Sequence, residues 1–154
     1  MRQSANAFKL SSEVTPYMIS SKIEKRRKIW VVLPAFNEAE NLGCLIENIA
    51  DAMSSQQNPF EIVVVDDGSQ DQTRAVAESF QCQIPVTVLV HEKNQGLGAT
   101  MRDGFKYVSE HSAARDVVVA MDADNTHNPA LIAQMTHCIL EGNDVVIASR
   151  YQLG

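Results

Sequence analysis

The stretch Val-Val-Val-Ala-Met-Asp-Ala-Asp-Asn-Thr-His-Asn, residues 117–128, joins an apolar run to two closely spaced carboxylates. An uninterrupted apolar run is typical of a strand buried on both faces of a parallel sheet. Asp122 and Asp124 follow where that run ends, and open parallel sheets bind ligands beyond the carboxyl ends of their strands. Carboxylate oxygens suit Mg²⁺ or Mn²⁺, which often share their coordination with water and substrate phosphates. The stretch therefore predicts a parallel α/β fold with a metal-diphosphate site at this strand end.

Apolar runs alternate with amphipathic segments along the rest of the chain. Strands are predicted at residues 29–33, 62–65, 86–90, 117–120 and 145–148. The predicted apolar faces of the first and third helices are, respectively, Leu42, Leu45, Ile46, Ile49 and Met53, and Leu97, Met101, Phe105 and Val108. Ser69 with Gln72 fits a capping box at the start of the second helix. The alternation predicts one α/β domain with a mostly parallel sheet and helices on both faces.

Composition limits the class of protein. The net charge of −6, from 13 Lys and Arg against 19 Asp and Glu, argues against a nucleic-acid-binding protein, which normally has a basic face. No apolar stretch approaches the roughly 18 residues of a transmembrane helix, and the N-terminus lacks the apolar core of a signal peptide. The three cysteines fit no zinc or disulfide pattern. We therefore expect a cytoplasmic protein, with peripheral association at the cytoplasmic face of a membrane left open.

Residues 1–28 differ from the rest of the chain. They are Ser-rich at first and end in a basic cluster, and their apolar residues are poorly periodic. We expect a mobile N-terminal extension over 1–28, and the alternative is a weakly amphipathic segment lying on an anionic membrane. Residues 29–154 are expected to form the α/β domain, which stops a few residues after its fifth strand.

Two common nucleotide-binding signatures are absent. No Gly-x-Gly-x-x-Gly follows the first strand, which argues against a dinucleotide-binding dehydrogenase. No Gly-x-x-x-x-Gly-Lys-Ser/Thr loop is present, which argues against a P-loop NTPase. Gly96-x-Gly98 alone is a weak signal, because a loop that turns tightly into a helix also favours glycine.

Five blocks of sequence nevertheless form a recognisable set. They are VVLPAFNEAENL (31–42), EIVVVDDGSQDQT (61–73), NQGLGAT (94–100), MDADNTHNP (121–129) and VVIASRY (145–151). In order and spacing they resemble the family 2 glycosyltransferases, and most of all the dolichyl-phosphate mannose synthase and polyprenyl-phosphate glycosyltransferase branch. The resemblance covers about residues 28–151. It implies the Rossmann-like GT-A fold of nucleotide-diphospho-sugar transferases, a GDP- or UDP-sugar donor, Mg²⁺ or Mn²⁺, and inversion of the anomeric centre.

The resemblance also implies roles for individual residues. The residues that match donor-binding positions of the family are Pro34, Phe36, Glu38, Val64, Asp66, Ala123 and Arg150, and those that match metal-binding positions are Asp122, Asp124 and Thr126. An aromatic ring and a carboxylate suit a nucleoside, and an arginine suits a diphosphate. Phe36 replaces the family's frequent Tyr, so a hydroxyl contact is lost there. Helix capping by Asn37 and Glu38, a turn-forming role for Asp66, and a supporting role for Asp67 are alternatives drawn from the residues themselves.

The reaction that we expect is transfer of a sugar from a nucleoside diphosphate to an acceptor such as polyprenyl or dolichyl phosphate. Asp122, Asp124 and Arg150 would stabilise the leaving diphosphate, and no residue is assignable as a catalytic base. Family members continue well past the Ser-Arg-Tyr block into an acceptor-binding half, so we expect a fragment or a donor-binding half. A non-catalytic nucleotide-sugar-binding module is the alternative. A sugar-nucleotidyltransferase is disfavoured, because that class favours a Gly-rich, basic loop after the first strand.

Overall fold

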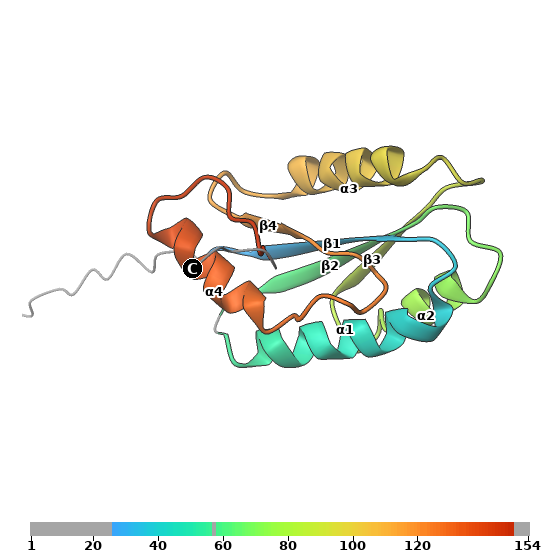
Figure 1. Cartoon of the computed structure of the whole chain (residues 1–154), viewed down its shortest axis with the longest axis horizontal. Helices are drawn as coiled ribbons and strands as arrows, with labels where there is room; N and C mark the ends of the chain where they lie inside the picture. Colours follow the sequence, from blue (N-terminus) through green and yellow to red (C-terminus); the bar gives the residue numbers. More distant parts are fainter. Residues whose placement is uncertain (1–25, 57, 150–154) are drawn as a thin grey trace, which may run out of the picture.

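Four strands form one sheet in the computed structural model, which describes residues 26–56 and 58–149. The strands are β1 (Ile29–Ala35), β2 (Phe60–Asp66), β3 (Val86–Val90) and β4 (Val117–Ala120), and their order across the sheet is β3-β2-β1-β4. The helices are α1 (Ala39–Ser54), α2 (Thr73–Ser79), α3 (Leu97–His111) and α4 (Leu131–Leu140). Every pairing in this sheet is parallel, which confirms the predicted fold class (Figure 1).

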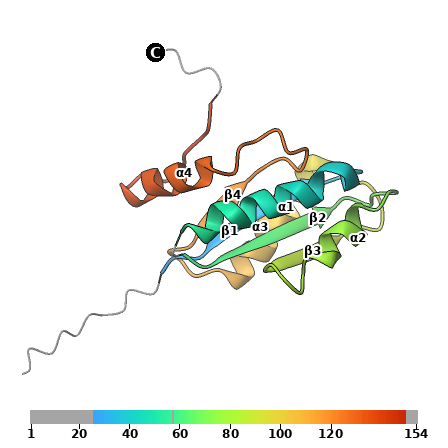
Figure 2. The ribbon, with the colours of Figure 1, turned by 90° about the horizontal axis from the view of Figure 1, so that it is seen from below.

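Helices lie on both faces of the sheet, as predicted. Among the described helices, α3 covers one face, whereas α1, α2 and α4 lie on the other side (Figures 1 and 2). The chain steps from β1 to β2 to β3 and then returns past β1 to β4. Because parallel crossovers are right-handed, this reversal moves the connecting helix α3 to the opposite face. In open α/β sheets, ligands bind beyond the carboxyl ends of the strands at such a reversal, which here lies between β1 and β4.

Alternate side chains of β1 point into two separate cores. Ile29, Val31 and Leu33 are buried on the side of α1, whereas Trp30 and Val32 are buried on the side of α3. The apolar face predicted for α1 is confirmed, because all of its members are buried in the first of these cores: Leu42, Leu45, Ile46, Ile49 and Met53. The continuous apolar run of β1 is therefore explained by burial on both faces of the sheet.

The prediction of a fifth strand at residues 145–148 is wrong. This segment has no regular secondary structure, and Val145 and Ile147 are 76% and 81% exposed. An apolar run becomes a strand only by hydrogen bonding to a neighbouring strand, and β4 is the edge strand of the described sheet. An apolar cavity of about 460 Å³ is lined by residues of β4, α4 and the 145–148 segment. The outward side chain of Val118 is 43% exposed, so β4 is buried on one face only.

The predicted apolar face of α3 is also wrong in most of its members. The buried residues of this helix are Thr100, Gly104 and Val108, whereas Leu97 and Phe105 are 62% and 43% exposed. A Cβ atom added to Gly104 would lie 2.6 Å from Cγ1 of Val32 in the sheet. Close approach of helix and sheet requires small residues at the contact, whereas the sequence pattern gives weight to large apolar ones.

The folded part of the chain includes residues assigned to the N-terminal extension. The predicted extension at 1–28 falls mostly outside the described residues, which begin at 26. The backbone N–H of Lys28 donates to Oδ1 of Asp116 at 3.0 Å, and the Lys28 carbonyl accepts from the N–H of Val117 at 3.0 Å. The Lys28 ammonium also lies 3.7 Å from the centre of the Trp30 ring. Lys28 therefore belongs to the domain rather than to the extension.

Candidate functional site

The carboxyl ends of β1 and β2 lie side by side and bring the first two loops together. Pro34 and Ala35 pair in register with Val65 and Asp66. The N–H of Asp67 donates to the carbonyl of Ala35 at 2.8 Å, so the contact continues past the end of β2. Because the strands are parallel, the loops that follow them open at one edge of the sheet.

The start of α1 is held by side chains of the loop after β2 and of Thr73, the first residue of α2. Ser69 Oγ accepts from the N–H of Asn37 at 2.9 Å, and Thr73 Oγ1 accepts from the N–H of Glu38 at 2.8 Å. Asp71 Oδ2 accepts from the N–H of Ala39 at 3.2 Å. No side chain of α1's own N-cap residue makes a capping bond. The loop after β2 thus satisfies N–H groups at the start of α1 that the helix itself leaves without partners.

The capping functions expected from the sequence are therefore distributed differently. The capping box of Ser69 with Gln72 is wrong, because Gln72 makes no side-chain cap and Ser69 bonds to Asn37 instead. Asn37 adopts a positive φ of 55°, and its Oδ1 accepts from the N–H of Gln70 at 2.9 Å. The carboxylate of Glu38 accepts from the Asn41 amide at 2.9 Å. Asn37 and Glu38 thus tie the two loops and the first turn of α1 together.

Asp66 borders a polar pocket at this edge of the sheet. The residue is 2% exposed, and its Oδ1 accepts from the N–H of Ser69 at 3.1 Å, which gives it the turn-forming role weighed from the sequence. The pocket has a volume of about 330 Å³, and its lining includes Ser69, Arg74 and Glu92. At the adjoining end of β1, Pro34 is half-buried and the ring of Phe36 is 43% exposed.

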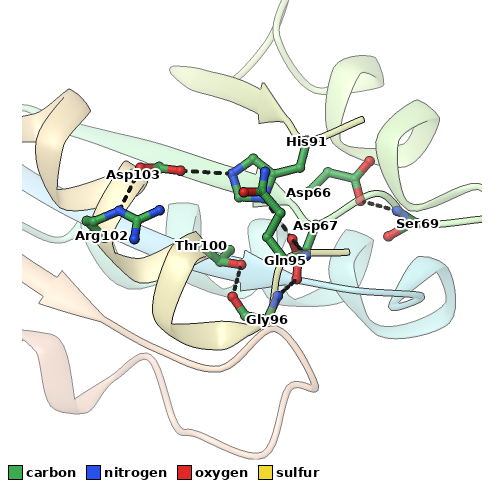
Figure 3. A network of polar contacts seen from close by, with 9 residues as sticks. All are labelled: Asp66, Asp67, Ser69, His91, Gln95, Gly96, Thr100, Arg102 and Asp103. Atoms are coloured by element: carbon green, nitrogen blue, oxygen red, sulfur yellow. Dashed lines mark hydrogen bonds and ion pairs between the residues drawn. The ribbon is translucent and has the colours of Figure 1, made fainter. Parts of the chain in front are cut away.

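Asp67 is a buried support of the next loop along the sheet. Its Oδ1 accepts from the N–H of Gln95 and its Oδ2 from the N–H of Gly96, each at 2.8 Å. His91 Nδ1 lies 2.7 Å from Asp67 Oδ1 (Figure 3). Burial raises the pKa of Asp67, but the bonds from His91, Gln95 and Gly96 outweigh that effect and hold the pKa below its ordinary value. The supporting role expected for Asp67 agrees with these contacts.

The role of His91 could not be predicted from the sequence, because its two partners are distant in the chain. Asp67 precedes it by 24 residues, and Asp103 follows it by 12, so no short motif links them. The interpretation of Gly96 as a turn residue is confirmed. Gly96 has a φ of 88° and stands immediately before α3, a conformation that side chains with a Cβ rarely adopt.

The loop after β4 presents two carboxylates on one side. Met121 and Ala123 are buried, whereas Asp122 and Asp124 are exposed. Oδ1 of Asp124 accepts from both the N–H of Thr126 at 2.9 Å and its hydroxyl at 2.7 Å, which closes a tight turn. The loop therefore places carboxylate and hydroxyl oxygens close together at the open edge of the sheet.

Two further contacts fix this loop. His127 Nδ1 accepts from the N–H of Asp122 at 3.3 Å, consistent with a supporting role. The amide of Asn125, which has a φ of 58°, lies 3.7 Å from Cys44 Sγ on α1. The loop with the two carboxylates is thereby joined to the helix that begins at the first loop.

Two predicted donor-binding residues are buried, and a third falls outside the described part of the chain. Val64 is fully buried and Ala123 is 3% exposed, and the side chains of both belong to the core on the side of α1. Their side chains can support the site from beneath but do not face it. Arg150 lies outside the described residues.

The oxygen-rich loops fit a divalent cation shared with a ligand. Within residues 26–56 and 58–149, no group of three or more His, Cys, Asp or Glu side chains is arranged to hold a metal ion. Two carboxylates with a neighbouring hydroxyl suit Mg²⁺ or Mn²⁺ when water and phosphate oxygens complete the coordination. The accumulation of carboxylates at this edge would also repel a diphosphate unless a cation accompanied it.

Comparisons with known proteins place the chain among sugar transferases. The family model described as glycosyl transferase family 2 matches residues 30–153. Dolichol-phosphate mannosyltransferase of Pyrococcus furiosus is 39% identical over 127 residues, which are 82% of this chain and 34% of that protein. Polyprenol monophosphomannose synthase of Mycolicibacterium smegmatis is 32% identical over 134 residues, which are 86% of this chain and 48% of that protein. The chain thus spans between about a third and a half of the length of these relatives.

A solved structure shares the fold. Glucosyl-3-phosphoglycerate synthase from Mycobacterium tuberculosis, in complex with Mn²⁺, UDP and glucosyl-3-phosphoglycerate, matches with a TM-score of 0.57 and 25% identity. The match covers 75% of this chain and 40% of that one. Among the described residues, no helix is both long and apolar enough to cross a membrane.

Proposed function

Because this chain belongs to glycosyl transferase family 2, we propose that it binds a nucleoside-diphosphate sugar together with Mg²⁺ or Mn²⁺ for transfer of the sugar to a polyprenyl phosphate. The observation that carries the proposal is the pair of exposed carboxylates, Asp122 and Asp124, directly beyond β4 at the reversal of the strand order. The relatives' names support the acceptor class, since one acts on dolichol phosphate and another makes polyprenol monophosphomannose.

The nucleoside would lie at the ends of β1 and β2. Phe36 offers an exposed ring for stacking against a base, while Asp66 and Glu38 offer carboxylates for polar groups of the base and ribose. The hydrogen bonds that the N–H groups of Asn37 and Glu38 donate to Ser69 and Thr73 fix these groups relative to one another. Preorganised contacts of this kind lower the conformational cost of binding.

The diphosphate would lie at the end of β4. Asp122 and Asp124 would hold the cation, with the Thr126 hydroxyl beside them, and Arg150 would contact the phosphates. A bound cation supplies positive charge that stabilises the leaving diphosphate. The phosphate oxygen of a polyprenyl phosphate is already anionic, so the reaction needs no strong base to activate it. Such an acceptor resides in a membrane, so the protein would meet it at the cytoplasmic face.

The test is calorimetric titration of the chain with UDP and GDP, each with and without Mn²⁺ or Mg²⁺. Wild type is expected to bind one of the nucleotides more tightly when the metal is present. The Asp124→Asn variant, which keeps the size of the side chain, is expected to lose that metal-dependent gain. Asp51→Asn is the matched control, because Asp51 is exposed on α1, outside these loops. Metal-dependent binding that survives intact in Asp124→Asn would refute the metal assignment.

Turnover separates the catalytic role from the binding role. The chain is incubated with a labelled nucleoside-diphosphate sugar and a polyprenyl phosphate, and the lipid product is extracted. Labelled lipid that disappears in Asp124→Asn supports transferase activity, since loss of one electrostatic contact to a leaving group costs about 10²–10³-fold in rate. Metal-dependent binding with no product would instead support the nucleotide-sugar-binding module.

A further inference from the structure

His91 is a buried ionisable residue to which no role in donor or metal binding has been assigned above. It follows β3 directly, and its side chain is only 9% exposed. Its backbone N–H donates to the carbonyl of Asp66 at 2.9 Å. The residue also lines the polar pocket that Asp66 borders. It therefore lies immediately behind the groups proposed to bind the nucleoside.

Both ring nitrogens of His91 face carboxylates. Nδ1 lies 2.7 Å from Oδ1 of Asp67, and Nε2 lies 3.2 Å from Oδ2 of Asp103 on α3 (Figure 3). Nε2 is shielded from solvent and makes no well-aligned hydrogen bond, so the ion pair is its polar contact. A neutral imidazole carries a proton on one nitrogen and would turn a lone pair toward one of the carboxylates. Only the protonated ring is attracted to both.

This histidine links two loops and a helix. Asp67 belongs to the loop after β2, and its carboxylate also binds the N–H groups of Gln95 and Gly96 in the loop after β3. The two loops are in close contact, because a Cβ atom on Gly68 would lie 2.6 Å from the carbonyl carbon of Lys93. Movement of His91 would therefore shift the turn that carries Asp66.

We propose that His91 is a positioning residue for the donor site, and that its ring holds the loop after β2 against the loop after β3 and α3 by bridging Asp67 and Asp103. This inference rests on the proposed function, since it concerns the same nucleoside-diphosphate site. Its consequence is that donor affinity depends on a residue that does not touch the donor. Loss of either contact of the His91 ring is expected to lower donor affinity, because the turn that carries Asp66 is then held less firmly.

Other charged groups surround this cluster and are held constant in the test. Arg102 lies 3.3 Å from Asp103 and partly neutralises it. Further charged residues near His91 belong to its own loop, to the end of β2 and to α2, and they are Glu92, Lys93, Asp66, Arg74 and Glu78. Arg74 is paired with Glu78 at 2.7 Å. Substitution of Asp103 alone leaves all of these residues in place.

The experiment measures the affinity for Mn²⁺ with UDP or GDP at one fixed pH. The variants are His91→Gln and Asp103→Asn, with Glu110→Gln as a matched control because Glu110 is exposed on α3 outside the cluster. Relative to wild type, His91→Gln and Asp103→Asn are each expected to bind the metal-nucleotide about tenfold more weakly, the size of one hydrogen bond to a charged group. Glu110→Gln is expected to keep the wild-type affinity.

Hydrogen exchange tests, without a nucleotide, whether His91 holds the two loops together. The amides of Gln95 and Gly96 are expected to exchange about tenfold faster in His91→Gln than in wild type, whereas the amide of Ile46 in the core of α1 keeps its rate and shows that the fold is intact. Equal affinities in wild type, His91→Gln and Asp103→Asn would overturn the positioning role. Failure of wild type to bind any metal-nucleotide would instead overturn the proposed function and the donor-site role of His91. Faster exchange of Gln95 and Gly96 in His91→Gln would then still show that His91 holds the two loops together.

Discussion

At the scale of single residues, Gly104 shows how closely α3 approaches the sheet. A Cβ atom there would lie 2.6 Å from Cγ1 of Val32 and 3.2 Å from Cγ2 of Val65. Both valines are fully buried and β-branched, so neither can move aside by a simple rotation. The absent side chain is thus a packing requirement of the α3 face of the sheet.

Gly104→Ala is expected to destabilise the protein despite the better helix propensity of alanine. Overpacking typically costs about 1–3 kcal/mol, whereas alanine gains roughly 1 kcal/mol over glycine inside a helix. We expect a net loss of about 1 kcal/mol in the free energy of unfolding, measured by urea denaturation. Gly98→Ala, on the same helix with no atom near its added Cβ, should not lose stability. A Gly104→Ala variant more stable than wild type would contradict this account.

Single residues also show what sequence can and cannot reveal about the site. Asp122 and Asp124 were predicted because their chemistry and their position after a strand are both local properties, although their binding of a metal stays a prediction. His91 was missed because its partners, Asp67 and Asp103, meet it only after three elements have packed together. A short motif can identify ligands close in the chain, but it cannot identify a bridge between loops.

At the scale of elements, the start of α1 depends on the first residue of α2. Thr73 is fully buried, and its hydroxyl accepts from the N–H of Glu38 at the first turn of α1. The two elements are therefore coupled through side chains rather than through strand pairing alone. This coupling holds the first loop beside the turn that contains Asp66.

Thr73→Val keeps the shape of the side chain but removes this acceptor. A buried N–H left without a partner costs about 1–3 kcal/mol, so we expect a loss in that range in the free energy of unfolding. Donor affinity should fall as well, since the loop after β1 loses the hydrogen bond that holds Glu38 against Thr73. Thr73→Ser retains the hydroxyl and should preserve most of both properties. Equal stability of Thr73→Val and wild type in urea would show that this bond is dispensable.

The elements that sequence predicted best are those whose burial is determined by many large side chains. The face of α1 was correct throughout, because five long apolar residues recur at helical spacing. The face of α3 was largely wrong, because its contact is made by a glycine and a threonine that no hydrophobic pattern marks. The fifth strand was wrong because strand formation depends on a hydrogen-bonding neighbour, which the apolar run 145–148 does not itself supply.

At the scale of the whole molecule, the two edges of the sheet differ in character. The residues around the end of β3 are polar and charged, as in the pocket near Asp66. The edge at β4 borders the apolar cavity of about 460 Å³ that also includes Phe105, Val145 and Ile147. Val118 and Val90, one on each edge strand, are equally exposed at 43%. The molecule therefore offers a matched pair of positions for comparing the two edges.

An apolar, unpaired strand edge is a template for aggregation in water. We expect the chain to self-associate as its concentration rises, and Val118→Lys to shift association to higher concentration. Val90→Lys, at the same exposure on the polar edge, should have little effect. Sedimentation velocity over a concentration series measures the concentration at which each variant associates. Equal association of Val118→Lys and Val90→Lys would contradict self-association through β4. Nucleotide titrations made in concentrated solution would then report on associated chains, so dilute samples give the affinity of the single molecule.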